Sequence, residues 1–130
     1  MKTKALMTLS ALFLGLMGVA ASFLPQEILT QFAMPVNALT VILLQITGAL
    51  GLGFAMLNWT ARGVVIGGIY ARPVALGNFV HFAVVAITLI RALTSGAARG
   101  SGIIAGCVVY LIFALWFGAV LFTSPSQKRA

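Results

Sequence analysis

Residues 102–123 read GIIAGCVVYLIFALWFGAVLFT, a long apolar run without a charged side chain. Three further apolar runs of similar length lie at residues 5–24, 37–57 and 74–94. An α-helix rises about 1.5 Å per residue, so roughly 20 apolar residues cross the ~30 Å hydrocarbon layer of a membrane. The sequence therefore predicts an all-α protein, a four-helix transmembrane bundle formed by a single integral membrane domain of residues 1–130.

The overall composition also indicates a membrane protein. Hydrophobic residues make up 62% of the chain and charged residues only 7%, and the mean hydropathy is +1.14. A soluble domain has about a quarter of its residues charged. Because Glu27 is the only acidic residue, paired catalytic carboxylates, carboxylate metal sites and membrane proton relays lack the groups they need. We expect a non-catalytic protein that holds no metal and no other cofactor.

The basic residues are divided unequally between the two sides of the predicted membrane domain. If the runs alternate in direction, one side carries Lys2, Lys4, Arg62, Arg72, Lys128 and Arg129, and the other carries Arg91 and Arg99. Cytoplasmic flanks of membrane helices are enriched in Lys and Arg. This distribution predicts that both termini and the central loop are cytoplasmic. Such a basic side attracts anionic phospholipid of the bilayer, and we expect no binding of nucleic acid.

The N-terminus has a second interpretation. Two lysines before an apolar stretch are also typical of a cleavable signal peptide. The apolar core of a signal peptide is about 7–15 residues long, whereas this stretch continues through residues 5–24. We therefore expect it to be retained as the first span.

The loop after the first span lies between Pro25 and Pro35. Proline ends a helix because it lacks a backbone N–H and its ring clashes with the preceding turn. Between these two prolines, residues 27–32 are predicted to form a short helix in the membrane interface.

Small residues mark the predicted contacts between helices. Apolar burial does not drive association in lipid, so helices pack where glycine permits close approach of the backbones. The predicted contact residues are Gly15 and Gly18 in the first run, Gly48 and Gly51 in the second, and the GxxxG pair Gly102 and Gly106 in the fourth.

A polar stripe runs along the third span. Asn78, His81 and Thr88 share one side of the predicted helix. A polar group facing lipid without a partner is costly, so all three are expected to face the protein interior. Asn58 ends the second run at the same membrane depth and is expected to meet Asn78 and His81. His81 titrates near neutral pH, so proton or ligand handling is an alternative to a purely structural hydrogen bond.

The central loop ends with GGIYARP at residues 67–73. It is too short to cross the membrane, and its aromatic and basic residues suit the interface and head groups. Glycines allow backbone amides to face an anion, and Arg72 can bind a phosphate; a turn merely anchored by Arg72 is the alternative. The candidate ligand-binding residues are Asn58, Arg62, Tyr70, Arg72, Asn78 and His81.

Two segments of the chain resemble a known group of proteins. They are the central block IGGIYARPVALGNFVHF at residues 66–82 and the end of the second run, GFAMLNW at residues 53–59. The chain resembles uncharacterised small four-span bacterial inner-membrane proteins of the domain-of-unknown-function type. The resemblance implies the four-span architecture and a location in the bacterial inner (plasma) membrane. It implies no catalytic residue.

Three functions are compatible with these features. The first is non-catalytic binding of lipid, or of a membrane partner such as a second copy of the chain, through the polar cluster and basic loop. The second is a small transporter or channel for an apolar or anionic solute, with Gln45, Thr88 and Arg91 near its outer half. The third is a membrane enzyme or redox accessory subunit that uses His81.

Overall fold

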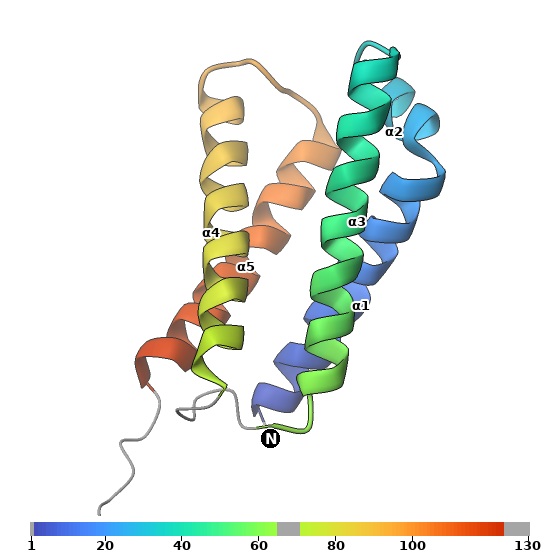
Figure 1. The fold of residues 1–130 in the computed structure, drawn as a ribbon. Helices are drawn as coiled ribbons and strands as arrows, with labels where there is room; N and C mark the ends of the chain where they lie inside the picture. The colour runs from blue at the N-terminus through green and yellow to red at the C-terminus, as the bar shows by residue number, and fades with distance from the viewer. Residues whose placement is uncertain (1, 65–70, 124–130) are drawn as a thin grey trace, which may run out of the picture. The chain divides into compact units, whose positions relative to one another are not determined.

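The computed structural model describes residues 2–64 and 71–123, and every regular element in these ranges is an α-helix. The helices are α1 (Lys2–Phe23), α2 (Pro25–Gln31), α3 (Ala38–Ala61), α4 (Arg72–Thr94) and α5 (Ser101–Thr123), as Figure 1 shows. All except α2 are long and apolar enough to cross a membrane. The predicted all-α class with four spans is confirmed, and the chain has the architecture of a multi-pass membrane protein.

The start of α3 is fixed by its own side chains. Asn37 Oδ1 accepts a hydrogen bond from the Thr40 backbone N–H at 3.0 Å, and Thr40 Oγ1 accepts one from the Asn37 N–H at 3.1 Å. This reciprocal capping box satisfies two donors that the first helical turn would otherwise leave open. The helix therefore begins where the sequence predicts.

The short helix expected between the two prolines is present as α2, two residues earlier than predicted. Pro25 is its first residue and cannot continue the hydrogen-bond ladder of α1. At its other end, Ala33 adopts a left-handed conformation with φ of 52°. Ala33 N–H donates to Thr30 O at 3.0 Å and Met34 N–H donates to Leu29 O at 2.8 Å, which is the Schellman pattern of a helix end.

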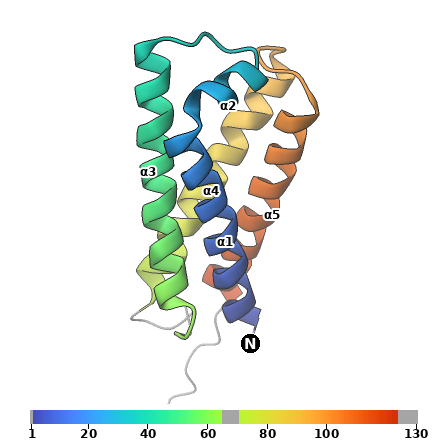
Figure 2. The same ribbon diagram turned by 90° about the vertical axis from the view of Figure 1, so that its right-hand side faces the viewer.

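The chain divides into two compact units. The first unit, Met7–Gly63, holds most of α1 together with α2 and α3. The second unit comprises Met1–Leu6 and Val64–Ala130 and contains α4 and α5. Within each unit the two long helices run antiparallel, α1 against α3 and α4 against α5 (Figures 1 and 2).

The first unit is held together by a close approach of the α1 and α3 backbones. A Cβ atom added at Gly18 would lie 2.8 Å from Leu52 N and 2.9 Å from Gly48 O. One added at Gly48 would lie 2.8 Å from the backbone N of Ser22. Real Cβ atoms do not approach backbone this closely, so these two positions require glycine in the observed packing.

The other two predicted glycines of this pair lie along the same contact. A Cβ at Gly51 would meet Leu14 O at 3.4 Å, and a Cβ at Gly15 would meet Ala55 Cβ at 3.6 Å. The contact at Gly51 is tight, and the contact at Gly15 is an ordinary van der Waals contact. All four glycines predicted for the first two runs therefore lie where α1 packs on α3, as expected for helices that associate through small residues.

The second unit is packed mainly by aromatic side chains. Phe82 of α4 is fully buried and stacks on Phe113 and Phe117 of α5, with ring centroids 4.9 and 5.7 Å apart. Such pairs add roughly 0.5–1.5 kcal/mol each beyond the burial of their area. The unit thus differs from the first, whose helices approach through glycines.

The glycines of α5 contribute unequally to this unit. A Cβ at Gly118 would lie 3.1 Å from the Phe79 ring, whereas one at Gly106 would lie 3.9 Å from Leu89 Cδ1. Gly102 is exposed at the first turn of α5. Gly118, which the sequence interpretation did not select, therefore meets α4 more closely than Gly106 does.

Candidate functional site

Asn58 forms a buried polar pair inside the first unit. Its Nδ2 donates a hydrogen bond to Ser10 Oγ at 3.0 Å, and Ser10 Oγ donates to Met7 O at 3.1 Å. Both Asn58 and Ser10 are fully buried. The sequence analysis did not select Ser10 as a contact residue. Ser10 lies eight residues before Gly18 and so on the same face of α1.

The predicted polar stripe of α4 is only partly turned inward. Asn78 is fully buried and its Nδ2 donates to Val74 O at 2.9 Å within the same helix. The expectation that Thr88 faces the interior is wrong, because this residue is exposed. Thr88 Oγ1 donates to Val84 O at 2.8 Å, so its hydroxyl is satisfied by its own helix.

His81 belongs to the aromatic side of the second unit. Its half-buried imidazole lies 5.2 Å from the Phe82 ring and 5.9 Å from the Tyr110 ring, measured between centroids. Tyr110 was not selected from the sequence. Its phenol gives this otherwise apolar cluster a second polar tip.

The expected meeting of Asn58 with Asn78 and His81 involves residues of both compact units. Asn58 belongs to the first unit, while Asn78 and His81 belong to the second, so their meeting stays a prediction. Tyr70, another candidate ligand-binding residue, lies outside the described residues.

Arg72, the first residue of α4, lies at the end of an open groove in the second unit. The groove has a volume of about 470 Å³ and is lined by Arg72, Pro73, Leu76, Phe79, Leu121 and Phe122. Arg72 is exposed. The Phe79 and Phe122 rings meet edge to face, 5.9 Å apart at 87°. A cation and an aromatic pair therefore stand together at this end of the α4–α5 pair.

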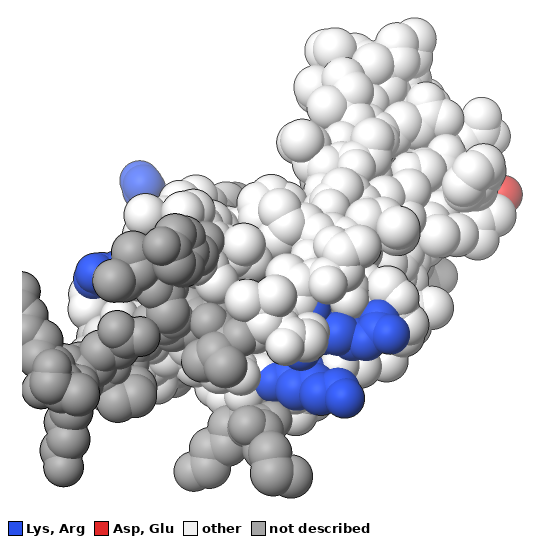
Figure 3. Space-filling view, turned by 60° about the horizontal axis from the view of Figure 1, so that its bottom comes forward, with Lys and Arg blue, Asp and Glu red and all other residues white. Residues whose placement is uncertain are grey.

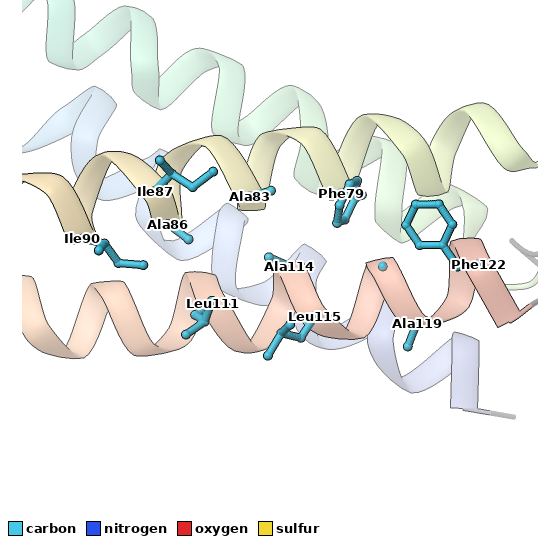
Figure 4. A pocket seen from close by; sticks show the side chains of 11 residues that line it. Phe79, Ala83, Ala86, Ile87, Ile90, Leu111, Ala114, Leu115, Ala119 and Phe122 are labelled. Carbon is cyan, nitrogen blue, oxygen red and sulfur yellow. The ribbon is translucent and has the colours of Figure 1, made fainter.

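A second groove of about 550 Å³ lies along the same two helices (Figure 4). It shares Phe79 and Phe122 with the first and extends as far as Ile90. The side chains that line it come from both helices and are apolar: Phe79, Ala83, Ala86, Ile87, Ile90, Leu111, Ala114, Leu115, Ala119 and Phe122. From Arg72 to Ile90 the helix rises roughly 27 Å, close to the ~30 Å of a hydrocarbon layer.

The first unit has its own apolar groove, of about 570 Å³, between α1 and α3. Small residues, including Ala11, Gly15 and Ala20, contribute to its lining, and Trp59 lines it near the end of α3. Arg62 lies over the Trp59 ring, with Cζ 3.6 Å from the ring centroid. Its Nη1 also donates to Trp59 O at 3.1 Å. Two interactions therefore hold this guanidinium against Trp59, one of the residues that line the groove.

Charge is sparse on the surface. The face in Figure 3 is mostly uncharged, with a few basic groups and one acidic group at its edge. In the described ranges no three His, Cys, Asp or Glu residues gather as a metal site. The chemistry offered by the described residues is thus that of a few cations and of long apolar grooves.

Comparisons with known proteins found no relative for this chain. No family model matches it, and neither the curated proteins nor the solved structures include a significant match. The grooves, with Arg72 and Trp59 among their lining residues, are therefore the features of this chain that bear on its function.

Proposed function

We propose that this chain is a non-catalytic multi-pass protein of the bacterial inner membrane that binds an anionic phospholipid between α4 and α5. The observation that carries the proposal is the position of Arg72 on a groove of α4 and α5 that shares Phe79 and Phe122 with the longer apolar groove of the same two helices. In this arrangement the lipid phosphate contacts Arg72 and an acyl chain follows the groove between the helices.

The chemistry of Arg72 suits a phosphate. Its planar guanidinium can donate two parallel hydrogen bonds to one phosphate group. Arg72 also begins α4, and the positive end of the helix dipole favours an anion there. A basic residue at an anionic membrane surface contributes about 1 kcal/mol in any case, so the groove is what distinguishes a binding site from general attraction.

The same proposal sets the orientation. The uneven distribution of Lys and Arg supports cytoplasmic termini and a cytoplasmic loop between α3 and α4. Arg62 and Arg72, at the two ends of that loop, would then both face the anionic inner leaflet.

Native mass spectrometry of detergent-released protein tests the proposal. The protein is incubated with equal amounts of phosphatidylglycerol and phosphatidylcholine, and retained lipid is counted. We expect a preference for phosphatidylglycerol that Arg72→Gln reduces by roughly fivefold, which corresponds to about 1 kcal/mol. Arg99→Gln removes the same charge from the α4–α5 connection and is expected to leave the preference unchanged.

A second variant tests the acyl chain. Ala119→Leu fills the groove and is expected to reduce retention of both lipids alike, because it obstructs the chain and not the head group. Ala105→Leu places the same side chain at an exposed position of α5 outside the groove and serves as the matched control. Equal retention of the two lipids by the unaltered protein would contradict the proposal.

A further inference from the structure

The groove between α1 and α3 is lined in part by Trp59, and the Arg62 guanidinium lies over the ring of this tryptophan. Arg62 follows the last residue of α3, whereas the only acidic residue of the chain, Glu27, belongs to α2 at the beginning of α3. The 24 residues of α3 separate these two ends by roughly 36 Å at about 1.5 Å per residue. Figures 1 and 2 show α2 beside the N-terminal end of α3.

Arg62 is also held in place before any ligand arrives. It stacks on the Trp59 ring at 3.6 Å and uses one N–H to bond the Trp59 carbonyl at 3.1 Å. A guanidinium has five N–H donors, so most of its donors are available to an anion. Stacking fixes the plane of the group and lowers the ordering cost of binding.

The groove beside Trp59 has the dimensions of a chain-binding surface. Its volume is about 570 Å³, and it runs along α1 from Ala11 to Leu24. Over these residues the helix rises roughly 20 Å, more than half of the ~30 Å hydrocarbon layer. Its lining is almost entirely apolar, so an acyl chain fits it without burying an unsatisfied polar group.

We infer that the α1–α3 groove is a second site for an anionic phospholipid, with the phosphate on Arg62 and an acyl chain along the groove beside Trp59. The site shares no residue with the α4–α5 groove. One chain then binds two anionic lipids, one on each unit.

Fluorescence of Trp59 tests this site directly. Trp116 is the only other tryptophan, so Trp116→Phe leaves Trp59 as the sole reporter. The protein is reconstituted in phosphatidylcholine vesicles in which a fraction of the lipid carries brominated acyl chains, either as phosphatidylglycerol or as phosphatidylcholine. From the quenching of Trp59, we expect phosphatidylglycerol to bind with a constant roughly fivefold higher than that of phosphatidylcholine. This is the difference expected for one basic contact.

Charge and groove variants separate the two parts of the site. Arg62→Gln should bring the two quenching curves together, while Arg99→Gln should leave them apart. Ala20→Leu fills the groove and should lower quenching by both lipids, and Ala49→Leu, at an exposed position of α3 outside the groove, should not.

Three results would overturn the inference: equal quenching by both lipids in the Trp116→Phe protein, an anionic preference that survives Arg62→Gln, or Trp59 shielded from both brominated lipids. The last result would indicate that another protein surface, such as a second copy of the chain, covers the groove. Arg72→Gln should leave Trp59 quenching unchanged, so this site and the α4–α5 site succeed or fail separately.

Discussion

Asn58 of α3 donates a hydrogen bond to Ser10 of α1 across 3.0 Å, with both side chains fully buried. Polar pairs of this kind in membrane helices contribute about 0.6 kcal/mol on average and up to roughly 1.7 kcal/mol. The pair fixes the register of α1 on α3, because a shift of either helix along its axis separates the two side chains.

We predict that Ser10→Ala and Asn58→Ala each lower stability and that their effects are coupled. The expected coupling energy is about 0.6–1.7 kcal/mol, since the hydrogen bond is lost only once in the double variant. Thermal or denaturant unfolding of the four proteins in one detergent measures it. Strictly additive effects would show that the hydrogen bond contributes nothing to stability.

Close backbone packing gives a second prediction, at Gly48. Gly48→Ala should destabilise the α1–α3 pair, because the new Cβ would meet the Ser22 backbone at 2.8 Å. Gly53→Ala is the matched control on the same helix, since a Cβ there meets nothing within 4 Å. The control should be neutral or stabilising by up to about 1 kcal/mol, because alanine favours the helix over glycine. Similar melting temperatures for the two variants would contradict the observed packing.

A third prediction concerns the end of α2. Ala33 has a φ of 52°, which costs a residue with a Cβ roughly 1–2 kcal/mol, and glycine adopts this conformation freely. Ala33→Gly should therefore raise the free energy of unfolding. The expected gain is about 0.5–1 kcal/mol, because the greater entropy of glycine in the unfolded chain offsets part of the relieved strain. Ala97→Gly, in the loop between α4 and α5, is the control and should not stabilise. A lower stability for Ala33→Gly would argue against the left-handed turn.

Orientation gives the fourth prediction. In a Cys107→Ala background, Ser95→Cys places a thiol in the loop between α4 and α5, and Val64→Cys places one after α3. An impermeant thiol reagent should label the cysteine at position 95 from the periplasmic side of intact cells. It should reach the cysteine at position 64 only after the membrane is opened. The reverse pattern would place the termini outside the cytoplasm.

Sequence alone predicted the four long helices because the responsible interactions are local. Length and apolar content decide whether a segment can cross a membrane, and no distant residue changes that requirement. Pro25 and the capping box of Asn37 with Thr40 set helix boundaries in the same local way. The contact glycines of the first two runs were predicted for a related reason. Membrane helices associate where small residues allow their backbones to approach closely.

The tertiary structure decided which face of each helix meets its neighbour. The long helices are apolar around most of their circumference, so periodicity did not separate a protein-facing side from a lipid-facing side. Thr88 therefore seemed a core residue but satisfies its hydroxyl within α4, while Ser10 and Gly118 carry contacts that only the pairing of helices creates. The grooves lined by Trp59 and by Arg72 were likewise decided by the tertiary structure, because a groove exists only once two helices are packed at one register.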